Sequence, residues 1–196
     1  MDFLYCISMY KTERNQRKKI IICAVAVMLF TTLFAGCTEE KKYTAALNFI
    51  VPELSDFDVE LEIINHTYEI DYKETEETSP IYDITIPEYI FIRYVGERKS
   101  VNLFAFKLDS IKEATEIFDL YKEYYLEHAT ELDVEDTIGD QTFRCQTFFA
   151  GMDGYGLEFR YANVVIALVG LTIDLDVLEN ISKVIEENIS LHIEQL

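Results

Sequence analysis

Carboxylates are the residues whose spacing most directly suggests chemistry, and they gather early in the chain. From residue 58 onward, apolar and acidic side chains alternate in two runs on either side of Asn65-His66, which predicts a hairpin with a two-residue loop. In that hairpin Glu60 faces Asp71 on the outer side. Glu62 faces Glu69 there as well, and like charges directly opposite destabilise a sheet. A divalent cation such as Ca²⁺, which prefers carboxylate oxygens, would relieve this repulsion.

The same four carboxylates have a simpler interpretation, which is a solvated acidic face of the hairpin. Nothing in the chain resembles the DxDxDG calcium loop. Two expectations therefore stay open for these carboxylates, a cation site and a solvated acidic face.

No catalytic set is recognisable among the other reactive side chains. The histidines at positions 66, 128 and 192 lie far apart and lack a metal-ligand spacing such as HExxH. GxSxG, P-loop and GxGxxG motifs are also absent. We expect no catalytic residue and no cofactor. A secreted hydrolase stays open as an alternative, because two Asp or Glu side chains suffice as acid and base for glycoside cleavage.

The first 37 residues differ sharply from the rest of the chain. A basic segment at 11–19 precedes an apolar run at 20–34, and Ala35-Gly36-Cys37 follows. A positive segment, an apolar core and small residues are typical of a secretory signal. The apolar run is also short for a membrane span of about 20 residues. Residues 1–36 are therefore predicted to be a signal peptide or a membrane anchor, with Met1 or Met9 as the start.

The pentapeptide Leu33-Phe34-Ala35-Gly36-Cys37 resembles the lipobox of prokaryotic lipoproteins, bacterial or archaeal. In that family the cysteine receives a diacylglyceryl group and becomes the mature N-terminus. The resemblance therefore implies lipidation of Cys37 and a place at the cytoplasmic membrane, with the domain on the extracytoplasmic side. An uncleaved N-terminal membrane anchor is the alternative.

Charge and composition exclude several partners. The chain has 17 basic and 36 acidic residues, and the part after Cys37 has 12 and 34, a net charge of −22. Nucleic acid is excluded because phosphate backbones are bound by clustered Lys and Arg. Anionic lipid repels such a domain, so its attachment must come from the lipid or the apolar segment. With 49% apolar and 13% aromatic residues, the chain can bury a core.

Further strands and helices must position these residues. Beyond the hairpin, strands are predicted at 81–86, 89–95, 101–108, 142–149, 155–161 and 163–171, and helices at 110–130 and from about 174 to the C-terminus. Ser110 and Glu113 form a capping box, which marks the start of the first helix. Pro87 should end the strand before it. Short turns demand antiparallel neighbours, so we predict an α+β fold, an antiparallel sheet packed by two amphipathic helices.

The order of elements from about Asp58 to the C-terminus is similar to that of PsbP/Mog1-like domains. It also resembles small domains of unknown function on exported prokaryotic lipoproteins. The local echoes are Ile138-Gly139-Asp140 before one strand and Leu157-Glu158-Phe159-Arg160 before a valine-rich one. Members of that group share no single activity, so the resemblance implies a fold and no catalytic residue.

Together these observations predict three parts: a leader at 1–36, a tether at 37–57 and one α+β domain at 58–196. We expect a lipid-anchored extracytoplasmic lipoprotein whose domain is a non-catalytic binding or accessory module. Its partner would be an unknown protein or small molecule, and a surface cation-binding protein is a further alternative. Asn65 begins the sequon Asn65-His66-Thr67 on the predicted turn, where it would be accessible if the host glycosylates exported proteins.

Overall fold

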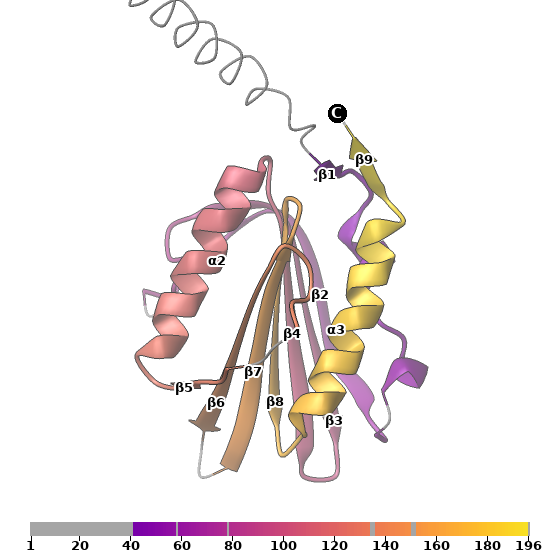
Figure 1. Cartoon of the computed structure of the whole chain (residues 1–196), viewed down its shortest axis with the longest axis vertical. Coiled ribbons are helices and arrows are strands. Elements are labelled where there is room, and N and C mark those ends of the chain that lie inside the picture. Colours follow the sequence, from indigo (N-terminus) through magenta and orange to yellow (C-terminus); the bar gives the residue numbers. More distant parts are fainter. Residues whose placement is uncertain (1–40, 58, 78, 134–135, 150–151, 196) are drawn as a thin grey trace, which may run out of the picture. The chain divides into compact units, whose positions relative to one another are not determined.

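Seven antiparallel strands form the main sheet of the computed structural model, and Figure 1 shows them spreading apart between two helices. Their order across the sheet is β2-β3-β4-β8-β7-β6-β5. The strands are β2 (Glu62–Lys73), β3 (Thr85–Gly96), β4 (Lys99–Lys107), β5 (Thr130–Glu131), β6 (Gln141–Phe149), β7 (Met152–Tyr161) and β8 (Val164–Leu171). This antiparallel sheet with its packed helices confirms the predicted α+β fold.

The structure describes residues 41–195 apart from 58, 78, 134–135 and 150–151. The predicted leader and Cys37 lie outside the described residues. Residues 40–196 form a compact unit of their own. Within the described ranges, neither helix combines the length and the hydrophobicity that a bilayer span requires.

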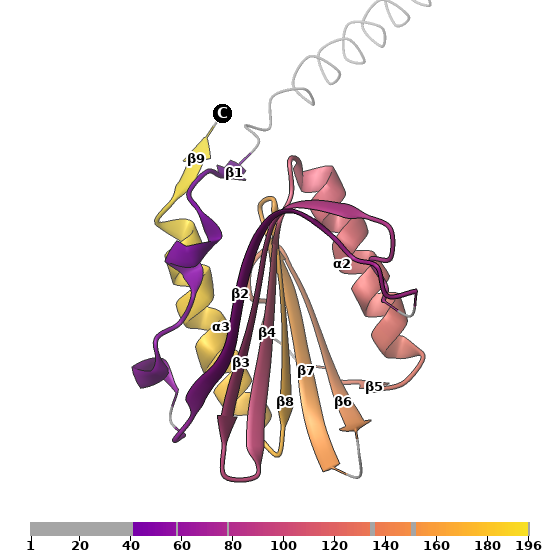
Figure 2. The ribbon, with the colours of Figure 1, turned by 180° about the vertical axis from the view of Figure 1, so that it is seen from behind.

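Helices α2 (Ile111–Leu126) and α3 (Leu175–Ser190) cover opposite faces of the sheet, as Figures 1 and 2 show from two sides. The predicted capping box is confirmed, because Glu113 N donates to Ser110 Oγ at 3.2 Å and Ser110 N donates to Glu113 Oε2 at 3.0 Å. The central strands are apolar on both faces, so each face needs its own cover. The two helices therefore lie on opposite faces of the sheet.

Two hydrophobic cores result, one on each face. The α3-face core joins Ile90, Ile92, Leu103, Ile166 and Leu168 of the sheet to Leu178, Ile181, Ile185 and Ile189 of α3. The α2-face core joins Tyr89, Phe106, Phe143, Cys145 and Val165 to Ala114, Ile117, Phe118 and Tyr121 of α2. The apolar stripes predicted for both helices are therefore core surfaces.

The folded unit begins earlier than the predicted tether allows. β1 (Lys41–Tyr43) pairs with β9 (Ile193–Gln195), and the 3₁₀ turns η1 (Leu47–Ile50) and η2 (Leu54–Asp56) follow. Four side chains of this segment are buried in the α3-face core, namely Tyr43, Leu47, Ile50 and Phe57. Residues 41–57 thus belong to the domain and not to a tether. Their apolar residues follow neither helix nor strand spacing, so no periodic pattern reveals them.

The predicted hairpin at Asn65-His66 is wrong. Residues 62–73 form the single strand β2, which pairs along its length with β3. A β-bulge between Ile63 and Asn65 shifts the register and leaves the alternation on both sides intact. A tight two-residue turn also favours Gly at a positive φ, which Asn65-His66 lacks. Pairing with the apolar strand β3 therefore prevails.

Pro87 does not end a strand as predicted, because β3 starts at Thr85 and runs through it. The register pairs Ile70 with Glu88 and Tyr72 with Ile86, so Pro87 lies opposite Asp71. Asp71 has φ 52°, a left-handed conformation. This local break in β2 accommodates a residue that has no N–H to donate.

Candidate functional site

The four carboxylates predicted to face one another lie along one stretch of chain instead. Glu62, Glu69 and Asp71 belong to the same strand β2, and Glu60 precedes it. At about 3.3 Å per residue, Glu62 and Glu69 are roughly 20 Å apart. Among the described residues, no group of three or more His, Cys, Asp or Glu side chains could hold a metal ion. The pairing that motivated the cation site is thus not present.

The predicted glycosylation site lies on this strand too. Asn65 is exposed on β2, directly after the bulge. Its surroundings are those of a sheet edge and not of the predicted turn. Accessibility is retained because β2 is the last strand of the sheet.

A buried carboxylate on β3 accepts three hydrogen bonds on the α3 face. Glu88 is 7% exposed, and its Oε1 accepts from Leu47 N at 2.6 Å and from Tyr68 Oη at 2.8 Å. Its Oε2 accepts from Lys107 Nζ at 2.9 Å. Burial by itself would raise the pKa of Glu88. The three hydrogen bonds and the charge of Lys107 outweigh it and lower the pKa, so Glu88 is ionised at neutral pH.

The same network ties the start of the domain to the sheet. Lys107 Nζ also donates to Ala45 O at 2.7 Å and lies 5.7 Å from the ring centre of Tyr43. Asn163 accepts from Tyr43 N at 2.7 Å and donates to Leu108 O at 2.7 Å. These contacts join residues more than 40 positions apart, so they fasten the segment at 43–47 onto β3, β4 and the start of β8.

An open pocket of about 340 Å³ lies beside this network. Its lining combines Lys42, Tyr43, Thr44, Ile70, Pro87, Glu88, Lys107, Leu108 and Asp109. Glu88 and Lys107 in this lining are engaged by the network, whereas Lys42 and Asp109 are not part of it. The arrangement of Glu88 and Lys107 is that of a structural ion pair and not of a proton donor and acceptor poised for a reaction.

A second pocket, of about 190 Å³, opens between β3 and the start of α2. Three carboxylates line it, those of Asp109, Glu113 and Glu116. Glu113 already accepts from Ser110 N in the capping box, and Glu116 pairs with Lys112 at 3.6 Å. This arrangement does not favour the carboxylate-dependent hydrolase, which needs two carboxylates free to act on a substrate.

Glu158 on β7 is a second buried carboxylate, and it lies on the α2 face. Leu157 and Phe159 on either side belong to the α3-face core, so Glu158 points toward α2. It is 1% exposed, and neither carboxyl oxygen has a partner among the described residues. Burial raises the pKa of Glu158 well above its usual range. The charge of Asp119 adds to the rise and that of Lys122 opposes it, and the burial favours the neutral form of Glu158.

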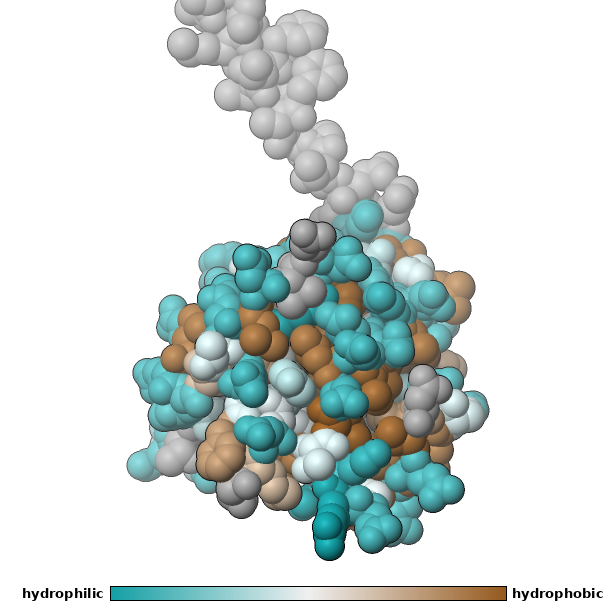
Figure 3. All heavy atoms as spheres, turned by 60° about the horizontal axis from the view of Figure 1, so that its bottom comes forward, coloured by the Kyte–Doolittle hydropathy of each residue, from teal (hydrophilic) through white to brown (hydrophobic). Residues whose placement is uncertain are grey.

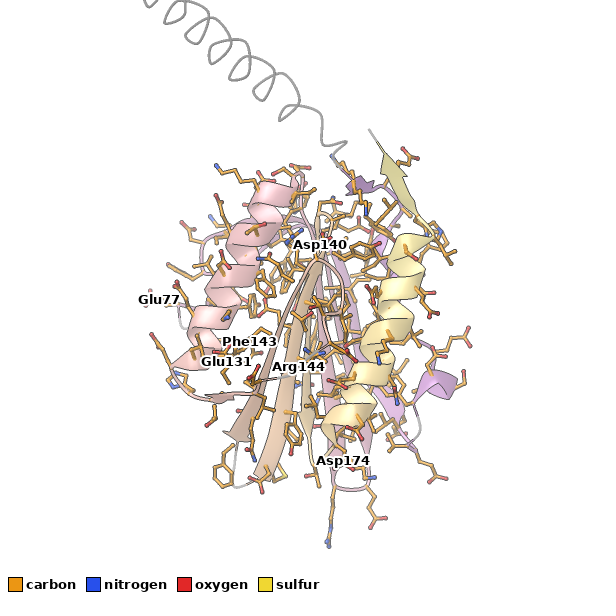
Figure 4. The ribbon with its side chains drawn as sticks, viewed as in Figure 1. Glu77, Glu131, Asp140, Phe143, Arg144 and Asp174 are labelled. Atoms are coloured by element: carbon orange, nitrogen blue, oxygen red, sulfur yellow. The ribbon has the colours of Figure 1, made fainter. Side chains whose placement is uncertain are left out.

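On the opposite face, Arg144 of β6 is 4% exposed and pairs with Glu179 of α3. Its Nε donates to Glu179 Oε1 at 2.8 Å, whereas its Nη2 is buried without a partner among the described residues. Figure 4 shows Arg144 next to Phe143, whose side chain belongs to the α2-face core. The pair therefore joins β6 to α3 and leaves the pockets untouched.

No sequence motif singles out Glu88, Lys107 or the chemistry of Glu158. One signal was present, since Glu88 and Glu158 both interrupt strands that are otherwise apolar. A charged residue at an inward-facing position of such a strand must either find a partner or become neutral. Which of the two outcomes applies depends on segments far away in the sequence.

Comparison with known proteins yields a likeness of fold. The chain matches no family model and no curated protein. Its structure is similar to the crystal structure of the extracellular domain of PknH from Mycobacterium tuberculosis. The TM-score is 0.55 at 11% sequence identity, over 76% of this chain and 98% of that one. At this identity the likeness concerns the fold alone.

Proposed function

We propose that this protein is an extracytoplasmic lipoprotein, anchored through Cys37, whose domain is a non-catalytic binding or accessory module. The observation that carries the anchoring is the leader, in which a basic segment, an apolar run and Ala35-Gly36 lead to Cys37. Two acyl chains on that cysteine would give stable membrane attachment, which a single chain does not.

The position of the domain's first residue supports this proposal. The first strand of the domain starts at Lys41, so only three residues, 38–40, lie between Cys37 and that strand. At about 3.5 Å per residue, such a linker spans roughly 10–14 Å. A lipidated Cys37 would thus hold the domain at the bilayer surface. The net charge of −22 would repel it from anionic lipid.

Binding is favoured over catalysis by the state of the buried acids. Glu88 is engaged by three donors, and Glu158 is enclosed beneath α2 away from both pockets described above. The fold likeness to an extracellular domain is consistent with a place outside the cytoplasm. A sheet that ends in a long exposed strand offers a surface for a partner.

The anchoring is tested by Cys37→Ser in cells, with Cys23→Ser as the matched control inside the apolar run. We expect Cys37→Ser to leave the precursor unprocessed or to release the domain from membranes, and Cys23→Ser to behave like the wild type. Fractionation and gel mobility measure both outcomes. Identical size and membrane association of Cys37→Ser and the wild type would rule out lipidation at this residue.

The extracytoplasmic placement has a separate measurement. Protease added to cells from which the wall and any outer membrane have been removed should digest the domain while leaving a cytoplasmic marker intact. Protection of the domain until the membrane is lysed would contradict the proposal.

A further inference from the structure

We propose that β2 binds an extended basic segment of a partner protein, which adds as a new strand to the edge of the sheet. This inference rests on the proposed function as a binding module and names the surface and the kind of partner. It follows from the position of β2, from the different character of its two faces, and from the charge of the domain.

β2 is the exposed end of the sheet. It spans 12 residues and pairs with β3 on one side, and it ends the seven-strand order. Figure 2 shows it running along the edge and bending over the end of the sheet. The opposite end is closed differently, since the short β5 and Leu132 N, which donates to Arg144 O, cover part of β6. A long strand with unpaired N–H and C=O groups is a template for strand addition.

One face of β2 is mostly apolar and continues the α3-face core, with His66 beside Ile92 as its polar residue. Ile63, Tyr68 and Ile70 are 44%, 39% and 60% exposed. The register places Ile63 beside Tyr94 and Tyr68 beside Ile90, both fully buried. An added strand would cover these exposed side chains with apolar residues at every second position.

The other face of β2 is acidic and polar. Glu62 pairs with Val95 and Glu69 with Tyr89, so both carboxylates lie on the face opposite the apolar stripe, and both are exposed. Opposite charges on neighbouring strands stabilise a sheet, which calls for Lys or Arg at the alternate positions of the added strand. The domain's net charge of −22 would steer such a segment toward the edge.

The same charge argues against a second copy as the occupant. Two domains of net charge −22 repel each other, and each would bring its own Glu62 and Glu69 to the shared edge. Charge on an edge strand is a common protection against pairing with an identical chain. A basic partner segment is instead attracted to these carboxylates.

Two irregularities set the length of the site. The bulge lies between Ile63 and Asn65, and the left-handed Asp71 interrupts the strand at its other end. Residues 65–70 are thus the regular stretch between them. We infer that a partner segment of about six residues pairs there, close to the mode of strand lengths in proteins.

The test uses the full chain in neutral detergent micelles and a capped peptide with the sequence Lys-Val-Arg-Val-Lys-Val. We expect saturable binding by calorimetry and slowed hydrogen exchange of amides in residues 65–70. Two versions of the peptide carry N-methyl groups at alternate residues, in the two possible phases. One phase blocks the donors that face β2 and should abolish binding, whereas the other should be tolerated.

Matched variants test the role of the charges. Glu69→Gln, within the stretch at 65–70, should weaken peptide binding about two- to fivefold, since an exposed charge pair contributes modestly. Glu123→Gln removes the same charge from an exposed position on α2 and should weaken it less than twofold. Equal loss in both variants would mean general attraction to an acidic protein and would overturn the assignment to β2.

Three other results would also overturn it. They are no saturable binding at millimolar peptide, equal loss of binding in both N-methyl phases, or protection confined to another strand. Protection of β2 that rises with protein concentration in the absence of peptide would assign the edge to a second copy. Because binding is measured on detergent-solubilised chain, these outcomes are independent of whether Cys37 is lipidated.

Discussion

Two glutamates buried on opposite faces of the same sheet have pKa values that are shifted in opposite directions. Glu88 on the α3 face accepts three hydrogen bonds, which outweigh its burial and lower its pKa. Glu158 on the α2 face has no partner among the described residues, and burial raises its pKa well above the usual range. Both side chains are less than 10% exposed. Hydrogen-bond donors, and not depth, therefore decide the direction of each pKa shift.

The difference arises from what covers each face. The α3 face is shared between a helix and the segment at 41–57, whose backbone and neighbours bring donors to Glu88. The α2 face is covered by aromatic and aliphatic side chains, and stacked rings of Tyr72, Tyr89, Phe106 and Tyr121 follow one another 4.1–5.5 Å apart. An irregular segment can satisfy a buried charge because its backbone groups are free to bond, whereas a helix has used its own.

The largest expected effect concerns the cover of the α2 face. Phe118 is 4% exposed within that core, so Phe118→Ala should lower the free energy of unfolding by about 3–5 kcal/mol. Tyr124→Ala on the exposed side of α2, where the side chain is 38% exposed, should cost less than about 1 kcal/mol. Urea melts measure both. An unchanged midpoint for Phe118→Ala would mean that α2 does not cover Glu158 as described.

The second effect tests how much the ion pair between Glu88 and Lys107 contributes to the free energy of unfolding. Glu88→Gln leaves Lys107 without its counter-charge in a site only 20% exposed, and we expect a loss of about 3 kcal/mol. Asp83→Asn breaks the exposed pair with Lys73 and should cost no more than about 1 kcal/mol. Similar losses of stability for the two variants in urea melts would show that Glu88 and Lys107 do not form a buried ion pair.

The third prediction uses the opposite signs of the two pKa shifts. Because the folded pKa of Glu158 is raised, its contribution to stability is full below the ordinary pKa of about 4.5. That contribution declines as pH rises toward the folded value, by up to about 1.4 kcal/mol per pH unit. The folded pKa of Glu88 is lowered, so its contribution is present above about pH 4.5 and is lost as pH falls through the folded value.

Urea melts between about pH 3 and pH 8 distinguish the two residues. Relative to the wild type, Glu158→Gln should gain stability with rising pH, and Glu88→Gln should lose it. A difference between Glu158→Gln and the wild type that stays constant over this range would show that Glu158 keeps an ordinary pKa.

The smallest effect concerns the rate at which a thiol reagent modifies Cys145. This rate reports how well the α2 face excludes water. Burial raises the pKa of the Cys145 thiol to about 11. In a chain whose other cysteines are serine, a thiol reagent at pH 8 should react with Cys145 about a hundredfold more slowly than in urea, because less thiolate is present. Phe118→Ala should speed the reaction in the folded state. Fast labelling of the unaltered fold would contradict a closed α2 face.

Helix α2 and the central strands could be predicted from the sequence because their signals are local. Ser110 and Glu113 are three residues apart and satisfy each other's backbone, so the start of the helix follows from four residues. The strands around Phe104 and Val165 are apolar on both faces, which already requires a cover on each side.

Which strand pairs with which cannot be predicted from local signals in the same way. The alternation at 62–73 fits a hairpin and a continuous strand equally well, and the choice depends on the competition offered by β3, more than ten residues further along. The same holds for the candidate sites. The carboxylates of β2 were visible in the sequence, but whether they meet or line an edge followed from that pairing.

Residue type and local spacing thus determined the two helices, the strand-rich composition and the acidic charge of the domain. The tertiary structure alone decided that residues 41–57 join the core, that the pKa of Glu88 is lowered and that of Glu158 raised, and that β2 is an open edge. The physical reason is that burial and hydrogen bonding are set by groups distant in sequence, such as Leu47 N and Lys107 Nζ around Glu88. Only the folded chain brings them together.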